Sequence, residues 1–246
     1  MEIYTKTDIG IERTENQDCV WGEMLSPTAC AAVLCDGMGG ESDGGLASTM
    51  AVDIVSKRIK ESFSEHMNRN SVRNLLITSV IAANSIVYEE SLKRPVRAVM
   101  GTTCVAAIVF GGTAYIINVG DSRAYMAFTT DTDDCIRQLT KDHSRVQELV
   151  DRGHIMPEEA KFHPDTNIIT RAVGVDRDVT PDYFEADIAE GQKLLLCSDG
   201  LSTYGDDFDI MDICIYTKPA EVCPKLIEYA NGNGGHDNVS VAFVTV

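Results

Sequence analysis

Hydrophobic and polar positions along the chain follow two periodicities, one typical of strands and one typical of helices. Short apolar runs between turn residues predict strands, which fall at residues 3–7, 20–24, 29–35, 102–110, 113–119, 124–128, 183–187, 193–197 and 239–246. Apolar residues spaced three and four positions apart predict helices, which fall at residues 46–59, 72–87, 144–152 and 219–230. The chain therefore alternates blocks of strands with blocks of helices.

Turn and capping residues refine these boundaries. Gly111-Gly112 separates two strands by two residues, which predicts a hairpin, and residues 124–128 are expected to continue the same meander. Ser71 is placed to cap the second helix at its N-terminus, and Gly153 is placed to end the third helix.

The order of elements predicts a layered α+β domain. Hairpins imply antiparallel sheets, and amphipathic helices must cover the faces of those sheets. Residues 154–182 contain three prolines and no clear periodicity. The stretch 145–182 is therefore expected to be an appendage on the layered domain.

Composition and charge exclude several classes of protein. The 246 residues include 21 basic and 38 acidic side chains, which gives a net charge of −17. Nucleic acids and anionic membrane surfaces attract the opposite charge, so neither is expected as a partner. The chain has no apolar run long enough to span a membrane and no apolar N-terminal signal, which predicts a cytoplasmic protein. Eight scattered cysteines without a C-x-x-C pair predict buried free thiols.

Aspartate accounts for 22 of the 38 acidic residues, and four of them lie at the ends of predicted strands. Two similar apolar strands end in the dipeptides Asp36-Gly37 and Asp199-Gly200. Asp18 and Asp237 stand immediately before two other strands. Taken singly, an Asp-Gly dipeptide is most simply a turn. Four such placements favour a shared role.

Antiparallel pairing would gather these four carboxylates, because the end of one strand lies beside the start of its partner. Asp18 would then lie near Asp36, and Asp199 near Asp237. Clustered carboxylates repel one another unless a cation lies between them. Oxygen ligands without histidine or cysteine favour Mg²⁺ or Mn²⁺ over Zn²⁺. Gly37, which has no Cβ, could approach closely and offer its carbonyl to the metal.

Two further residues are candidates, each with a simpler alternative. Asp142 could be a fifth ligand, although by itself it is better interpreted as the N-cap of the helix that follows. Arg13 could bind a phosphate through two parallel hydrogen bonds, although an exposed arginine is the common case. The glycine-rich stretch 37–45 lacks the ending of a nucleotide-binding P-loop. It is interpreted as loop geometry beside the metals.

Seven short motifs resemble those of the metal-dependent protein phosphatases of the 2C type, in their compact bacterial form. In chain order these are RTENQD at 13–18, CDGMGG at 35–40, GTT at 101–103, NVGDSR at 118–123, LTKDHS at 139–144, CSDGL at 197–201 and GHDN at 235–238. The likeness covers nearly the whole chain. Their joint presence in this order is far more specific than any one motif.

The resemblance implies a four-layer α/β/β/α sandwich, in which two stacked antiparallel sheets are flanked by helices. Residues 1–246 would form a single phosphatase catalytic domain, with a flap-like insertion around 145–182. By matching position, Asp36 would bridge two ions and Gly37 would give its carbonyl to one of them. Asp199 and Asp237 would complete the other site.

The remaining roles also follow from the resemblance. Asp18 would hold a metal ion or its water, and Asp142 would support a third ion together with Asp199. Arg13 would bind the substrate phosphate. The cofactors would be two or three Mn²⁺ or Mg²⁺ ions.

Several positions depart from the family pattern or lie outside it. Gln17 stands where many members have Glu, which implies a weaker second metal site. Met38 replaces the histidine of eukaryotic members, and a metal-bound water or His163 could then be the general acid; His163 could equally be a packing residue. Asp121 and Arg123 are interpreted as structural, joined by local hydrogen bonds in a turn.

The predicted function is the hydrolysis of phosphoserine and phosphothreonine on proteins by a water that bridges two divalent cations. The expected enzyme is a cytoplasmic monomer that acts on phosphorylated proteins, including substrates of a Hanks-type Ser/Thr kinase. Two alternatives stay open. One is a catalytically weak module of the same fold that binds phosphoproteins, and the other is a metal-dependent phosphoesterase that acts on small metabolites.

Overall fold

A computed structural model describes residues 1–40, 43–94 and 99–246, and it contains two antiparallel sheets. The strand order of the first is β1-β11-β10-β7-β8, from β1 (Glu2–Asp8), β11 (Val239–Thr245), β10 (Lys193–Cys197), β7 (Arg123–Thr129) and β8 (Asp134–Gln138). The order of the second is β2-β3-β5-β6-β9, from β2 (Asp18–Ser26), β3 (Ala29–Gly39), β5 (Cys104–Phe110), β6 (Thr113–Val119) and β9 (Asp182–Asp187). The short β4 (Met100–Thr102) pairs with the end of β3.

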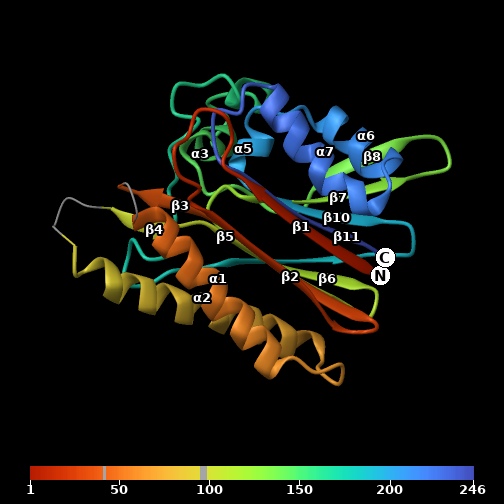
Figure 1. Cartoon of the computed structure of the whole chain (residues 1–246), viewed down its shortest axis with the longest axis horizontal. Coiled ribbons are helices and arrows are strands. Elements are labelled where there is room, and N and C mark those ends of the chain that lie inside the picture. The colour runs from red at the N-terminus through yellow and green to blue at the C-terminus, as the bar shows by residue number, and fades with distance from the viewer. Residues whose placement is uncertain (41–42, 95–98) are drawn as a thin grey trace.

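Helices cover the outer face of each sheet, so the molecule has four layers (Figure 1). The long pair α1 (Asp43–Ser62) and α2 (Arg69–Ser91) lies against the second sheet. The pair α6 (Asp207–Tyr216) and α7 (Pro219–Gly232) lies against the first. The predicted α/β/β/α sandwich is confirmed. Among the described helices, none is long and apolar enough to cross a membrane.

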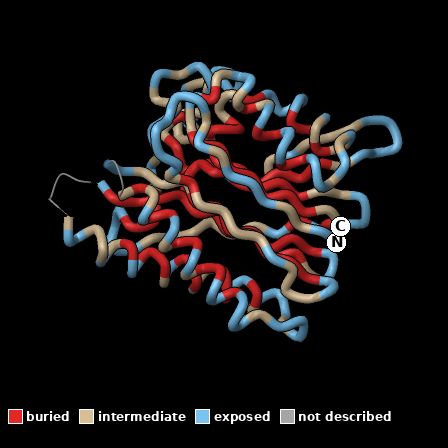
Figure 2. Tube along the Cα trace, viewed as in Figure 1, coloured by how far each residue is buried: buried red, intermediate tan, exposed pale blue. Residues whose placement is uncertain are grey.

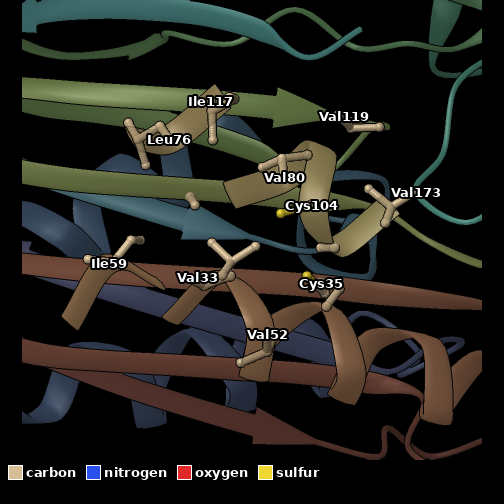
Figure 3. Close-up of a cluster of buried hydrophobic side chains, with 14 of the residues drawn as sticks. Val33, Cys35, Val52, Ile59, Leu76, Val80, Cys104, Ile117, Val119 and Val173 are labelled. Carbon is tan, nitrogen blue, oxygen red and sulfur yellow. The ribbon is translucent and has the colours of Figure 1, made fainter. Parts of the chain in front are cut away.

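Three apolar cores separate the four layers, and the side chains of β3 show how they form. Val33 and Cys35 point toward α1 and α2, whereas Ala32 and Leu34 point toward the other sheet. Both faces of this strand are buried, so its sequence is an unbroken apolar run and not an alternating one (Figure 2). Figure 3 shows the first core, where β3 and β5 meet the two long helices. The third core lies between the first sheet and α6 and α7, around Phe243.

The predicted hairpin is confirmed, but the predicted meander is wrong. Gly111 and Gly112 both have positive φ angles, of 59° and 73°, as a two-residue hairpin turn requires. After β6, however, the chain turns at Gly120 and β7 joins the other sheet, where it pairs with β10. The apolar pattern gives no local sign that the chain passes from one sheet to the other, because β6 and β7 are each buried on both faces.

Two local predictions also need correction. The N-cap of α2 is Asn68 and not Ser71, because the Asn68 side chain accepts a hydrogen bond of 2.9 Å from the Ser71 backbone N–H. The strand predicted at 29–35 continues to Gly39, since residues 37–39 pair with β4. Strands β4 and β8 were not predicted from the sequence.

Three short helices, α3 (Arg145–Asp151), α4 (Pro157–Ala160) and α5 (Asp199–Ser202), complete the fold. Helices α3 and α5 lie at the same end of the sheets, and the two chain termini lie together at the other end (Figure 1). The register between β1 and β11 agrees, since Glu2 lies opposite Thr245 and Asp8 opposite Val239. The strand ends at Asp8 and Val239 therefore face away from the termini.

Candidate active site

The predicted pairings bring the strand-end carboxylates together. Asp18 lies directly opposite Asp36 in the β2–β3 register. Strands β10 and β11 also pair as predicted, and their pairing continues one step further, where the Ser198 N–H donates to the Ser240 carbonyl over 3.1 Å. The Ser198 hydroxyl then donates to Asp18 over 2.8 Å. This bond links one sheet to the other at the site.

Burial and mutual repulsion make the ionised state of these carboxyls unfavourable. Burial, with added repulsion from Asp199 and Asp237, raises the pKa of Asp18 to about 7. Burial also raises the pKa of Asp36 well above its ordinary value, and Asp18, Asp199 and Asp121 raise it further. Burial and the charge of Asp237 also raise the pKa of Asp199 above its ordinary value. The cluster therefore holds protons near neutral pH unless a cation replaces them.

Three carboxyl oxygens in this cluster are buried without a hydrogen-bond partner among the described residues: Oδ1 of Asp18, Oδ1 of Asp121 and Oδ1 of Asp199. An unpaired buried carboxyl oxygen is strongly unfavourable, and a hard divalent cation relieves it. In the described part of the chain, no group of three or more His, Cys, Asp or Glu side chains is arranged to hold a metal ion as it stands. The carboxylates fit Mg²⁺ or Mn²⁺, with water and backbone carbonyls as the further ligands.

Each Asp-Gly dipeptide of the site needs glycine because backbone from elsewhere lies against it. A Cβ on Gly37 would lie 2.2 Å from the carbonyl oxygen of Gly44, in the first turn of α1. A Cβ on Gly200 would lie 2.1 Å from the carbonyl oxygen of Asn238. Gly37 is therefore packed against the start of α1. The stretch 37–45, interpreted as a loop, instead belongs to β3 up to Gly39 and to α1 from Asp43, and residues 41–42 lie outside the described residues.

Arg13 lies at the site, where it pairs with Asp237. Its Nη2 donates to the Asp237 carboxylate over 2.7 Å, and its Nε reaches the His236 carbonyl at 3.4 Å. The arginine side chain is 53% exposed, so it has room to bind a ligand from solvent. The position is consistent with a phosphate ligand, although the guanidinium is engaged with a carboxylate.

Asp142 is buried beside the cluster and is held by neighbouring side chains. The Arg123 guanidinium donates to both carboxylate oxygens, at 2.7 to 3.1 Å, and Gln138 donates to Oδ1 at 2.8 Å. The N-cap of α3 is Ser144, whose side chain accepts from the Gln147 N–H. The alternative interpretation of Asp142 as that cap is therefore wrong.

Asp121 is the residue that sequence reasoning missed. The structural interpretation holds for Arg123, which is satisfied by Asp142 and by the hydroxyl of Tyr125 at 2.8 Å. Among the described residues, Asp121 forms no ion pair with that arginine and one of its carboxyl oxygens has no partner, so Arg123 does not satisfy its carboxylate. Burial and the charges of Asp199 and Asp142 raise the pKa of Asp121 well above its ordinary value. Its place directly after strand β6 is the signal that could have identified it.

A cavity of about 640 Å³ opens beside the cluster. Asp121, Asp142 and Asp199 line it, together with Pro157, Glu158, Ala160 and Lys161 of the predicted flap. Lys161 of the flap donates to the Gly205 carbonyl over 2.6 Å, which joins the flap to the loop after α5. The predicted appendage thus lies over the site.

The structure shows the contacts of the residues that depart from the family pattern or were considered as the general acid. The Gln17 carbonyl accepts from the Gly37 N–H over 3.1 Å, so this residue lies against the Asp-Gly turn. Met38 pairs in register with Gly101. His163 accepts a hydrogen bond from the nearby Asp165 N–H over 3.1 Å, and it does not line the cavity. These contacts favour a packing role for His163.

Comparisons with known proteins agree with this geometry. A family model described as protein phosphatase 2C matches residues 12–219. The chain is 34% identical to the protein phosphatase PhpP of Streptococcus pneumoniae, over 100% of this chain and 98% of that one. The crystal structure of the serine/threonine phosphatase Stp1 from Staphylococcus aureus is 34% identical, with a TM-score of 0.89 over 100% of this chain and 94% of Stp1. The catalytic domain of the serine threonine protein phosphatase PstP, solved with two manganese ions, is 30% identical, with a TM-score of 0.80 over 98% of this chain and 96% of that domain.

Proposed function

Since the chain belongs to the protein phosphatase 2C family, we propose that it hydrolyses phosphoserine and phosphothreonine on proteins with divalent ions held by its buried carboxylates. The ligand set that we propose is Asp18, Asp36, Asp199 and Asp237, with the carbonyl of Gly37. One observation carries this assignment: buried carboxyl oxygens of Asp18 and Asp199 have no partner among the described residues.

Bound Mg²⁺ or Mn²⁺ would supply the nucleophile by lowering the pKa of water, and would neutralise charge on the phosphoryl oxygens. The chain's own residues prepare the site for this. Burial raises the pKa of both Asp36 and Asp199, and any proton that they hold would be lost when a cation binds. The Ser198 hydroxyl holds one oxygen of Asp18, and the other oxygen, which has no partner among the described residues, would be available to hold an ion.

Arg13 is proposed to bind the substrate phosphate. Its guanidinium lies at the rim, and it pairs with Asp237 through a single nitrogen. A cation on Asp237 would weaken that ion pair, because it satisfies the same carboxylate. The arginine would then be free to hold two phosphoryl oxygens in parallel.

For a third ion, the geometry favours Asp121 over Asp142 as the partner of Asp199. Asp121 has an unpaired buried oxygen and lines the cavity, as Asp142 also does. Asp142 could join only by releasing hydrogen bonds from Arg123 and Gln138. The two can be compared directly by counting bound Mn²⁺ in Asp121→Asn and Asp142→Asn variants.

The finer statements are part of the same proposal. We infer a single catalytic domain over residues 1–246, with residues 145–182 as the flap over the cavity. The physiological ion is proposed to be Mn²⁺ or Mg²⁺, two or three per chain. The protein is proposed to be a cytoplasmic monomer that opposes a Hanks-type Ser/Thr kinase.

Hydrolysis of a phosphothreonine peptide in Mn²⁺ tests the proposal, with a panel of phosphorylated metabolites measured alongside. Asp36→Asn and Asp199→Asn should each reduce kcat at least 100-fold, because each removes a charge from the ion site. Asp131→Asn, on an exposed hairpin tip, is the matched control and should not change it. Full activity in the first two variants would contradict the site. Faster turnover of a metabolite, or peptide binding without turnover, would favour one of the alternatives.

A further inference from the structure

His143 is buried between the candidate active site and the base of the flap, and the proposed chemistry does not use it. Its side chain is 6% exposed. It lies after Lys141 and Asp142, in the segment that leads from strand β8 to helix α3. Its hydrogen bonds reach two regions that are distant in the sequence.

On one side, His143 holds the backbone of Gly120 by two hydrogen bonds. The His143 N–H donates to the Gly120 carbonyl over 2.9 Å, and the Gly120 N–H donates to the ring Nδ1 over 3.0 Å. Asn118 donates to the same carbonyl over 3.1 Å. Gly120 has a φ of +104°, and a Cβ there would lie 2.6 Å from Thr103. These contacts leave the turn before Asp121 in one conformation.

On the other side, His143 contacts residues 170–182, the last part of the flap. Because Nδ1 accepts a hydrogen bond, the proton of the neutral ring lies on Nε2, which is 3.2 Å from the Asp182 carboxylate and 2.9 Å from Nη1 of Arg171. Both nitrogens are then donors, so the Asp182 carboxylate is the acceptor that they share. Arg171 donates to that carboxylate over 2.7 Å and to the Thr180 carbonyl over 2.8 Å. The His143 carbonyl accepts from the Thr170 N–H over 2.8 Å. The His143 ring therefore joins the Gly120 turn to residues 170–182 by direct contacts on both of its nitrogens.

We propose that His143 is a positioning residue that aims the Asp121 carboxylate into the ion site and couples its position to the flap. This proposal depends on the proposed function, since it assumes that Asp121 holds an ion. The two ring nitrogens have separate tasks. Nδ1 orients the turn before Asp121, and Nε2 connects that turn to Asp182 and Arg171.

Two substitutions separate these tasks. In His143→Asn the side-chain oxygen can occupy the place of Nδ1, so the Gly120 N–H keeps its acceptor, but contact with Asp182 is lost. In His143→Gln the amide lies near the place of Nε2, so the Gly120 N–H is left buried without an acceptor. An unpaired buried donor corresponds to about a 10- to 100-fold loss in a measured equilibrium.

Mn²⁺ binding followed by electron paramagnetic resonance is the main measurement. The Asn variant should bind Mn²⁺ within threefold of the wild-type affinity, and the Gln variant should lose about tenfold or more in one ion. The kcat for phosphopeptide should fall in the Gln variant with KM unchanged, a split that general loss of structure does not produce. Arg171→Gln should keep the Mn²⁺ affinity and increase protease cleavage within the flap.

Amide exchange of Gly120 in metal-free protein separates this proposal from the proposed function, because it requires neither an ion nor activity. Exchange should be slow in the wild type and the Asn variant, and about 10- to 100-fold faster in the Gln variant. A folded Asn variant that loses Mn²⁺ tenfold, or a Gln variant that retains both Mn²⁺ affinity and Gly120 protection, overturns the role. If the Gln variant does not fold, the Asn variant decides alone. A wild-type protein without Mn²⁺ binding would reject the proposed function and, with it, the coupling to an ion.

Discussion

Asp18→Asn should stabilise the metal-free protein while it disables the ion site. Burial raises the pKa of Asp18 from 3.8 to about 7. The folded protein therefore binds this proton more tightly than the unfolded chain, so stability is highest at low pH and falls as the pH rises through 7. At 1.36 kcal/mol for each pKa unit, the full loss by pH 8 is about 4 kcal/mol. Asparagine resembles the protonated acid and can still accept from Ser198, so it avoids this loss.

The assay is urea unfolding of wild type and Asp18→Asn with EDTA, at pH 5 and at pH 8. The variant should be more stable by about 4 kcal/mol at pH 8 and by about 1 to 2 kcal/mol at pH 5. Saturating Mn²⁺ at 100 times its Kd should stabilise the wild type by about 3 kcal/mol, and the variant by much less. Asp131→Asn, at an exposed turn, is the control and should leave both values unchanged. Equal stability of wild type and variant at pH 8 without metal would refute the electrostatic account of the cluster.

Two further predictions concern packing and capping. Gly37→Ala places a Cβ 2.2 Å from the Gly44 carbonyl oxygen and should lower the free energy of unfolding by about 1 to 3 kcal/mol in EDTA. Gly40→Ala has nothing within 4 Å and should change it by less than about 0.5 kcal/mol; similar losses in both would contradict the close approach. Asn68→Ala removes the cap of α2 and should lower thermal stability by about 1 kcal/mol, a few degrees in Tm, whereas Ser71→Ala should have little effect. A larger loss of thermal stability in Ser71→Ala than in Asn68→Ala would instead identify Ser71 as the cap.

Much of the site was predictable because its parts are local. A buried strand that ends in Asp-Gly places its carboxylate at the sheet end, and antiparallel pairing then places Asp18 beside Asp36. The same reasoning paired β10 with β11 and brought Asp199 toward Asp237. Each step depends only on apolar runs, turn residues and neighbouring strands.

Asp121 and Asp142 could not be assigned in this way. Both lie beside residues that could satisfy them locally, Arg123 for the one and the helix at Ser144 for the other. In the fold neither local partner is used. Arg123 binds Asp142, which is 19 residues away in the sequence, and Ser144 caps helix α3 in place of Asp142. Asp121 is left unpaired only as a result of that choice.

By itself, the sequence determined most of the strands, the long helices, the β2–β3, β5–β6 and β10–β11 pairs and the four strand-end carboxylates. Tertiary structure decided which sheet receives β7, how Ser198 of one sheet reaches Asp18 of the other, and which aspartate remains without a partner. The physical reason is the range of the interactions. Periodicity and turn chemistry act over a few residues, whereas burial, repulsion and hydrogen bonding between the two sheets depend on segments that meet only in the folded chain.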